Sequence, residues 1–365
     1  MQSSEESPHR RVVRGRGAQS QPANPHLAVN EQPDYEHFDG DEEFLQAVGR
    51  PATTYRDDLS QSIVSENRSP DLPFRYSINP YRGCAHGCSY CYARPTHEYL
   101  GFSAGLDFET KVLVKRDAAE LFQRWLARPR YLPAPVMFSG VTDCYQPIER
   151  TLRLTRECLC VALACSQPVG CVTKNALVTR DLDLWSALAE RGVGQVAVSL
   201  TTLDASLARV MEPCTSSPPA RLRAIEALTE AGVPVHVMLA PLIPGLNDSE
   251  APALLAAARE AGASSASHIL LRLPSTVRPV FIEWLEAFFP DKVDRVVGLL
   301  KSSRGGRMND PRFGSRMRGE GAYAEQLAQT VSVVSRKLGF APHPKPLRSD
   351  LFKPPVIAGS QRRLF

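Results

Sequence analysis

The chain has 365 residues, of which 43% are hydrophobic and 22% are charged, and its formal net charge is +4. These values are typical of a globular protein with one large domain and tails, and no apolar run is long enough to span a membrane. A net charge this small for the length neither requires a nucleic acid partner nor excludes one.

Residues 1–45 are expected to form a disordered tail. Basic residues are concentrated in its first part, and an acidic run without basic residues follows from Glu31 to Glu43. Charge blocks with few aliphatic side chains cannot bury enough surface to offset the entropy of ordering. The basic arm is interpreted as solvated, with contact to nucleic acid as the alternative. Residues 46–71 are interpreted as an irregular lead-in.

Three cysteines, Cys84, Cys88 and Cys91, lie in one loop with the spacing Cys-x-x-x-Cys-x-x-Cys. Gly83 and Gly87 allow the backbone of this loop to wrap closely around a buried inorganic group. Three thiolates without a fourth nearby leave one coordination position open, which a catalytic metal centre requires. The pattern therefore predicts a three-cysteine iron–sulfur cluster.

A zinc site and a disulfide are the alternatives for these cysteines. A structural zinc ion takes four ligands, and His86 or His97 could supply the fourth. A disulfide would leave one thiol spare, whereas the lack of a signal peptide and the odd count of nine cysteines suit a reducing compartment. We therefore expect a cytoplasmic protein.

From Phe74 onward, short apolar strands alternate with amphipathic helices. The strands are expected at 74–79, 111–115, 136–140, 170–174, 195–200, 233–239 and 267–273. The helices are expected at 118–127, 152–166, 181–191, 205–210, 219–231, 249–261 and 277–289. This alternation predicts an α/β fold with a parallel sheet, and right-handed crossovers would curl six βα units into most of a barrel. Chemistry is then expected at the carboxyl ends of the strands.

Polar residues follow several of these strands. They are Ser139, Thr142, Asp143, Thr173, Lys174, Ser199, Thr201, Thr202 and Arg272. Residues 241–245, Pro-Leu-Ile-Pro-Gly, form a rigid apolar turn after the fifth strand of the barrel. A lysine, an aspartate and hydroxyl groups that converge at one mouth suit a zwitterionic amino acid attached to a ribose. A capping or solvent-exposed role is the alternative for each residue.

The cysteine loop, with the aromatic Tyr90 before its third cysteine, resembles the signature of the radical S-adenosylmethionine (radical SAM) superfamily. Three sequence motifs are similar to those of the branch that contains spore photoproduct lyase and DNA repair photolyase-like proteins. They are Asn-Pro-Tyr-Arg-Gly-Cys at 79–84, Thr-Asp-Cys-Tyr-Gln-Pro at 142–147 and Thr-Lys at 173–174. The resemblance covers about residues 72–290 and implies a partial (β/α)6 barrel, which we assign to residues 46–290.

The resemblance implies an enzyme with a 4Fe-4S cluster on the three loop cysteines and SAM as its second cofactor. Such an enzyme cleaves SAM reductively to a 5′-deoxyadenosyl radical that abstracts hydrogen from a substrate. A flavodoxin- or ferredoxin-like electron donor is the implied partner, and nucleic acid is a candidate substrate. The alternatives are a radical SAM enzyme that acts on a peptide, tRNA or metabolite, and a non-catalytic iron–sulfur sensor.

The resemblance also implies which side chains would bind SAM. Polar groups would contact the amino group, carboxylate and ribose, and apolar groups would pack on the adenine. Ser139, Thr142 and Asp143 are assigned to the amino group or ribose, Lys174 and Ser199 to the carboxylate or ribose, and Tyr90 and Ile243 to the adenine.

One position departs from that branch. Where spore photoproduct lyase has a hydrogen-donating cysteine, this sequence has Gly140. Cys144 is a candidate donor in its place, with a buried structural cysteine as the alternative. Tyr92, directly after the last loop cysteine, is the second candidate catalytic residue. The remaining helical and strand cysteines are interpreted as core residues: Cys158, Cys160, Cys165 and Cys171.

Residues 291–340 are interpreted as an arginine-rich extension with a closing helix at 323–338. Its arginines fall within fifteen residues: Arg304, Arg307, Arg312, Arg316 and Arg318. Such a stretch can clamp the phosphates of a nucleic acid or a cofactor. A solvated loop, or arginines paired with acids of the barrel, are the alternatives. Residues 341–365 are expected to be a flexible tail.

Overall fold

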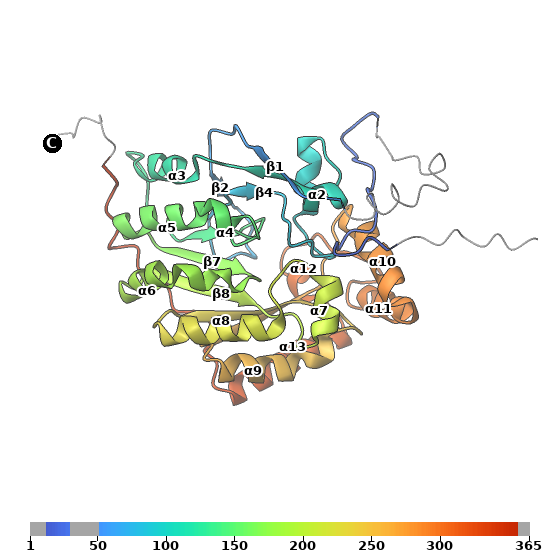
Figure 1. The fold of residues 1–365 in the computed structure, drawn as a ribbon. Coiled ribbons are helices and arrows are strands. Elements are labelled where there is room, and N and C mark those ends of the chain that lie inside the picture. The colour runs from blue at the N-terminus through green and yellow to red at the C-terminus, as the bar shows by residue number, and fades with distance from the viewer. Residues whose placement is uncertain (1–11, 30–50, 357–365) are drawn as a thin grey trace, which may run out of the picture.

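A computed structural model describes residues 12–29 and 51–356 of the chain. Its centre is a seven-stranded sheet in the order β10-β9-β8-β7-β6-β3-β2, in which the strands from β10 to β3 are parallel and β2 pairs antiparallel with β3 (Figure 1). The strands are β2 Val64–Glu66, β3 Tyr76–Ile78, β6 Val136–Phe138, β7 Val169–Thr173, β8 Gly194–Ser199, β9 Val235–Leu242 and β10 Ser265–Leu270. The predicted α/β fold with six parallel βα units is confirmed.

Helices that connect these strands lie in a row along the sheet (Figure 1). They are α3 Ala118–Leu126, α5 Leu154–Cys165, α6 Leu182–Glu190, α8 Pro218–Glu230 and α9 Ala251–Glu260. Each places one apolar face on the sheet; in α6 that face is Leu184, Trp185 and Leu188, all buried. Along most of β9, fully buried residues alternate with partly buried ones, because successive side chains point to opposite faces of the sheet.

A second, three-stranded sheet in the order β1-β5-β4 lies beside the barrel. Its strands are β1 Thr54–Asp57, β4 Tyr81–Arg82 and β5 Lys111–Val114. The strand predicted at 111–115 therefore exists but belongs to this sheet. The lead-in at 46–71 is not wholly irregular, because β1 and β2 lie within it. All four residues of β1 are exposed, so its sequence has no alternating burial pattern to reveal it.

Residues 12–29 form a segment that we call the N-terminal strap, and for this part of the chain the prediction of a disordered tail is wrong. Ala18 is fully buried and Asn24 is 3% exposed. The Asn24 Nδ2 donates hydrogen bonds of 2.9 Å to the carbonyl oxygens of Glu98 and Phe102. The tertiary contacts supply the order that a segment of this composition lacks by itself. The rest of the predicted tail, residues 1–11 and 30–45, lies outside the described residues.

The carboxyl ends of the parallel strands point toward one end of the molecule, where the remaining large elements gather (Figure 1). These are η2 Arg94–Leu100, α2 Leu106–Thr110, α7 Ala205–Met211, α10 Val277–Phe288, α11 Val293–Ser302 and α12 Ser315–Arg318. The smaller turns are α4 Glu149–Leu152, η3 Ala176–Asp181, η4 Asp248–Glu250 and η5 Pro290–Lys292. The predicted closing helix is α13 Ala322–Lys337. No helix in the described ranges is long and apolar enough to cross a membrane.

Candidate active site

The cysteine loop leaves β4 at Arg82 and ends in η2 at the mouth of the barrel. Cys84 and Cys88 are buried and Cys91 is partly buried, and all three thiols are free. The Cys84 amide donates a 2.9 Å hydrogen bond to the carbonyl oxygen of Phe108, which anchors the start of the loop to α2. Three reduced thiols on one glycine-containing loop fit an iron–sulfur cluster.

A buried ion pair between Arg94 and Glu109 packs against the cysteine loop and supports it. Both side chains are fully buried. Arg94 donates to the carbonyl oxygen of Cys88 at 2.7 and 3.1 Å and to the carbonyl oxygens of Ala104 and Gly105 at 3.1 and 2.9 Å. Burial raises the pKa of Glu109, although Arg94 opposes this effect. The pair ties the second cysteine to the segment before α2.

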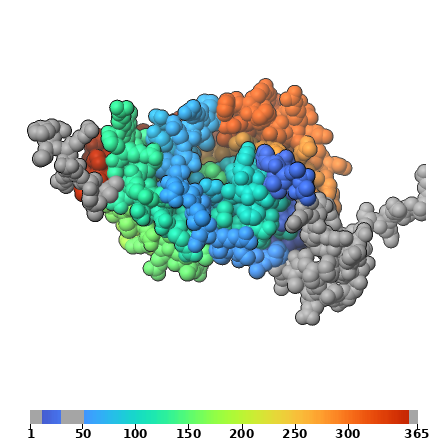
Figure 2. Space-filling view, turned by 90° about the horizontal axis from the view of Figure 1, so that it is seen from above, coloured from blue at the N-terminus to red at the C-terminus, as the bar shows by residue number. Residues whose placement is uncertain are grey.

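The N-terminal strap lies directly against the cysteine loop. A Cβ on Gly17 would lie 1.8 Å from the carbonyl oxygen of Gly87, so only glycine fits at position 17 without movement. The amides of Gly17 and Ala18 donate to the Glu109 carboxylate at 3.2 and 2.7 Å. In Figure 2 the dark blue strap lies beside the cyan residues that follow the loop. Nothing in the local sequence of the strap indicates this contact, because its partner lies about 70 residues further along the chain.

Lys174 and Tyr90 face each other at the mouth, with the lysine Nζ 5.7 Å from the centre of the tyrosine ring. Burial lowers the pKa of Lys174, but Cys88 and Glu212 outweigh that effect and its pKa is raised. In the described part of the chain, no hydrogen-bond acceptor contacts its ammonium group. A cation held in place without an acceptor fits the carboxylate of a bound amino acid.

Glu212 connects this pair to the rest of the mouth. Its fully buried carboxylate accepts hydrogen bonds from the hydroxyl of Tyr90, from Thr201 Oγ1 at 3.0 Å and from the guanidinium of Arg221. Arg221 also donates to the carbonyl oxygen of Ser199 at 3.0 Å, and Ser199 is 2% exposed. Glu212 directly follows α7 and Arg221 lies in the first turn of α8, and no sequence pattern singled them out.

The Asp143 carboxylate already has hydrogen-bond and ion-pair partners within the protein. Its carboxylate accepts from Thr173 Oγ1 at 2.9 and 3.0 Å and from the amide of Lys174 at 2.9 Å. It also forms an ion pair with His86 of the cysteine loop at 3.3 Å. Burial raises the pKa of Asp143, but His86 outweighs that effect and the pKa is lowered. Asp143 thus links the cysteine loop to the end of β7.

Ser139 and Thr142 lie in the same loop after β6 and also bond to the protein. Ser139 Oγ accepts the amide of Cys144 at 2.9 Å, and the Thr142 hydroxyl donates to the carbonyl oxygen of Tyr81 at 2.6 Å. Thr142 is 2% exposed. With Asp143, these side chains hold the loop in place and do not project freely into the mouth.

Ile243 and Tyr90 belong to one apolar cluster that also contains Cys88. Ile243 is fully buried, and its amide donates to Asn247 Oδ1 at 2.6 Å. Residues at the end of β10, Leu271 and Leu273, complete the same cluster. An apolar wall therefore lies next to the cysteine loop. It is formed at the part of the barrel that contains β9 and β10, and Tyr90 connects it to the loop.

The two candidate catalytic residues lie in different environments. Cys144 is fully buried in the main hydrophobic core, where its thiol contacts Cys171, so it cannot reach a substrate at the mouth. Tyr92 is 51% exposed, and its hydroxyl donates to the carbonyl oxygen of Gly140 at 2.9 Å. A Cβ at position 140 would lie 2.5 Å from the Cβ of Ser77, which leaves no room for a cysteine there.

The arginine-rich segment is mostly bonded internally, as one of the sequence alternatives proposed. Arg304 is 2% exposed and donates to the carbonyl oxygen of Leu271 at 2.6 Å. Arg312 pairs with Asp310 at 2.8 Å and Arg316 pairs with Asp71. These three arginines are therefore committed to protein groups. In the described ranges, the guanidinium groups of Arg307 and Arg318 have no hydrogen-bond or ion-pair partner.

A parallel partial barrel with three free cysteines on one loop at its carboxyl-terminal mouth defines a class of iron–sulfur enzymes. The family model for the radical SAM superfamily matches residues 78–258. The chain belongs to this superfamily. Its members use a 4Fe-4S cluster and SAM, so the predicted cofactors and the prediction of an enzyme are confirmed.

Relatives extend this comparison. An uncharacterised protein of Mycobacterium tuberculosis is 39% identical over 247 residues, which cover 66% of this chain and 72% of that protein. An uncharacterised protein of Methanocaldococcus jannaschii is 30% identical over 176 residues, or 48% of this chain and 63% of that protein.

The fold is similar to that of solved structures of spore photoproduct lyase. The complex of that enzyme with dinucleoside spore photoproduct has a TM-score of 0.59 and 16% sequence identity, with 87% of each chain covered. A mutant of the same enzyme with AdoMet and dinucleoside spore photoproduct has a TM-score of 0.56 and 16% identity, again with 87% of each chain covered. At these identities the similarity shows the fold, as predicted from the sequence motifs.

Proposed function

We propose that Cys84, Cys88 and Cys91 hold the 4Fe-4S cluster and that the mouth beside them binds SAM for reductive cleavage. The observation that carries the proposal is the position of three free thiols on one loop next to the unpaired ammonium of Lys174. When bound, the cluster and SAM would supply the reductive cleavage chemistry, with the electron delivered by an external donor. The protein orients SAM, excludes water and positions the substrate.

Lys174 is the proposed partner of the SAM carboxylate. Its ammonium lies beside Cys88 and the Tyr90 ring, and Glu212 holds Tyr90 in place through its hydroxyl. Tyr90 and Ile243 provide an apolar wall for the adenine, and Ser199 lies at the end of β8 for the ribose. The pairing of a fixed cation with a carboxylate fixes the methionine end of SAM relative to the cysteine loop.

Asp143, Thr142 and Ser139 act by positioning. Asp143 holds the amide of Lys174 and the ring of His86, and the other two hold the loop that follows β6. They thereby set the distance between the cysteine loop and the carboxylate-binding lysine. Backbone atoms of the same loop lie at the mouth and are the proposed contacts of the SAM amino group.

Tyr92 is the proposed hydrogen-transfer residue. Its phenol lies at the mouth, where the substrate is proposed to bind. Its phenol is exposed and bonded to the carbonyl oxygen of Gly140, whereas Cys144 is buried and is not proposed as a donor.

A flavodoxin- or ferredoxin-like protein is the proposed electron donor. Nucleic acid is the proposed substrate, supported by Arg307 and Arg318, whose guanidinium groups have no hydrogen-bond or ion-pair partner among the described residues, and by the branch that the motifs resemble.

A peptide or small metabolite is the second candidate substrate. The observation that favours it is the internal pairing of Arg304, Arg312 and Arg316, which leaves fewer cations for phosphates than the sequence suggested. Net charge is also small, at +4.

The proposed function is tested with anaerobically reconstituted full-length protein. After reduction with dithionite or with a flavodoxin system, SAM should be converted to 5′-deoxyadenosine and methionine, measured by liquid chromatography and mass spectrometry. Deuterated DNA, RNA, peptide and metabolite pools are then added in separate reactions, and deuterium in the 5′-deoxyadenosine identifies the substrate class. A protein that holds a cluster but never cleaves SAM would support the iron–sulfur sensor instead.

A further inference from the structure

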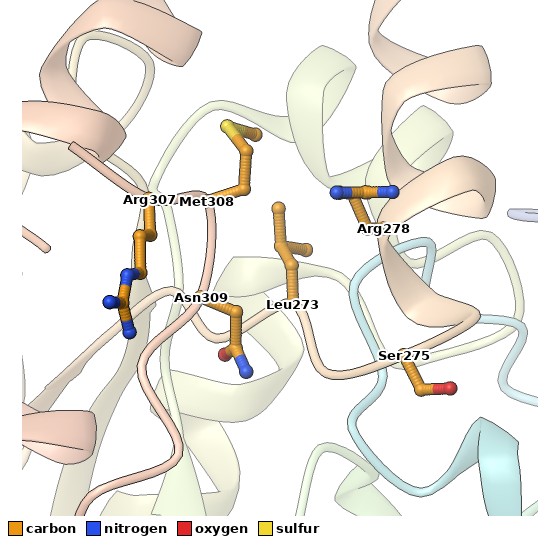
Figure 3. Close-up of a pocket in the computed structure, with 6 residues that line it drawn as sticks. All are labelled: Leu273, Ser275, Arg278, Arg307, Met308 and Asn309. Carbon is orange, nitrogen blue, oxygen red and sulfur yellow. The ribbon is translucent and has the colours of Figure 1, made fainter.

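A cavity of about 290 Å³ opens between the turn from β10 to α10 and residues 307–309 of the arginine-rich segment. It is lined by two arginines, two apolar side chains and two small polar ones, and it contains no acid. The lining residues are Leu273, Ser275, Arg278, Arg307, Met308 and Asn309, all labelled in Figure 3. Its volume is close to the lower limit of small-molecule sites, about 300 Å³, so it can take one small ligand or part of a larger one.

The two arginines of this cavity come from different elements. Arg278 lies in the first turn of α10, and Arg307 lies after α11. Figure 3 shows their side chains on opposite sides of Leu273 and Met308. In the described part of the chain, neither guanidinium has a hydrogen-bond or ion-pair partner, in contrast to Arg304, Arg312 and Arg316. Two unpaired cations without a carboxylate in the lining favour an anionic ligand.

Asn309 provides an independent indication of a ligand. Its Oδ1 atom is buried and has no hydrogen-bond partner, although the residue lines the cavity. Buried polar atoms are rarely left without partners in native proteins, so an unpartnered amide at a cavity wall calls for an explanation. An amide can donate and accept hydrogen bonds with the edge of a nucleobase. The backbone of Ser275 is also strained, with φ of 44°, as is often found at functional sites.

Part of the cavity wall packs in the apolar cluster next to the proposed cofactor site. Leu273 and Met308 belong to the apolar cluster that contains Cys88, Tyr90 and Ile243. Arg272, next in sequence to Leu273, is close enough to Tyr92 for each to affect the pKa of the other. A ligand in the cavity would thus lie beside the place where SAM and Tyr92 are proposed to act.

We propose that this cavity binds a nucleotide of a single-stranded or extruded nucleic acid segment, with the phosphates on its two sides contacting Arg278 and Arg307, one each, and its base against Leu273 and Met308. This inference rests on the proposed function and adds the substrate-binding residues. A cavity this small holds one nucleotide and not a duplex, so a base that reacts in the barrel must leave its stack. SAM itself carries no phosphate, so the cofactor does not account for the two arginines.

The test compares the Arg278→Gln, Arg307→Gln double variant with the Arg223→Gln, Arg336→Gln double variant. The control removes the same charge from exposed positions on α8 and α13, where these arginines have no hydrogen-bond or ion-pair partner among the described residues and do not line the cavity. The probe is a fluorescein-labelled single-stranded DNA 12-mer, and binding to reconstituted full-length protein is measured by fluorescence anisotropy at several salt concentrations. A 12-mer of the same sequence with methylphosphonate linkages is the uncharged probe.

We expect the cavity variant to lose at least about tenfold in affinity for the DNA at roughly 50 mM salt. Its slope of log affinity against log salt should fall by about 1.4, the value for two phosphate contacts on a single strand. The methylphosphonate probe, which lacks every phosphate charge, should bind wild type at least as weakly as the DNA binds the cavity variant. The control variant should keep the wild-type slope.

Equal slopes for the cavity and control variants would overturn the proposal. SAM affinity, measured by calorimetry on the same proteins, separates the two sites. If the cavity variant loses SAM affinity as strongly as DNA affinity, the cavity belongs to the cofactor and the nucleotide assignment is wrong. Wild-type protein that cleaves SAM but binds no DNA at low salt would overturn this inference and leave the radical SAM activity intact.

Discussion

The cysteine loop and the arginine-rich segment both have charged side chains near the mouth of the barrel, but these side chains are held by different kinds of contact. Arg94 and Glu109 under the loop are fully buried, and nearly all their polar atoms are bonded to the backbone or to each other. Arg312 and Asp310 of the segment form a pair in which the arginine side chain is 61% exposed. The cysteine loop is therefore supported by a buried and fully bonded ion pair, whereas the Arg312–Asp310 pair of the segment is exposed on its arginine side and is individually weak.

The largest effect is expected from the loop cysteines. Cys84→Ala, Cys88→Ala and Cys91→Ala should each abolish the cluster, because each removes one of the proposed thiolate ligands. Reconstituted wild type should bind about four irons and four sulfides, and each variant should lose the visible absorbance of the cluster. Cys158→Ala, in the buried face of α5, is the control that keeps it. Equal loss in this control would place the cluster elsewhere.

The buried ion pair provides a direct comparison of the two regions. Glu109→Gln should destabilise the protein by about 3–5 kcal/mol, because the guanidinium of Arg94 would stay buried without its counter-charge. Arg312→Gln should change stability by only about 1 kcal/mol or less, because the Arg312 side chain is 61% exposed and the buried Asp310 keeps its hydrogen bonds from Ser315 Oγ and from the amide of residue 312. Urea unfolding of both apoproteins measures the difference. Similar changes in the two variants would contradict the comparison.

Lys174→Ala should weaken SAM binding roughly tenfold to a hundredfold, or about 1.5–3 kcal/mol, because the carboxylate would lose its charged partner. The iron content should not change, because no cysteine is affected. Calorimetry with SAM on reconstituted protein measures the affinity. Lys301→Ala, an exposed lysine of α11, is the control. Unchanged SAM affinity for the Lys174 variant would show that this lysine has another role.

Gly17→Ala tests whether the N-terminal strap supports the cysteine loop. The added methyl group would overlap the carbonyl oxygen of Gly87, so the strap or the loop must move. We expect a loss of about 1–3 kcal/mol, as for overpacking in a tight contact, together with faster release of iron to a chelator. Gly298→Ala on α11, where a Cβ would meet nothing within 4 Å, is the control. Iron release at the same rate in both variants would show that the strap is independent of the loop.

Patterns within short stretches of sequence predicted the fold well. The six parallel strands and their helices follow from local alternation of apolar and polar residues, because each element must bury one side against its neighbours. The spacing of Cys84, Cys88 and Cys91 likewise lies within one loop, and the family comparison confirms the cofactors that it implies. Asp143 and Lys174 were placed at the mouth because parallel strands end at the same edge.

The sequence by itself thus determined the parallel barrel, the cysteine loop and the class of chemistry, because each depends on neighbours in the chain. Only the tertiary structure decided how those parts are joined. It placed Gly17 against Gly87, buried Cys144 in the core and paired Arg316 with Asp71 across 245 positions of sequence. Contacts between segments this far apart have no local periodicity, so burial and pairing could be known only once the chain was folded.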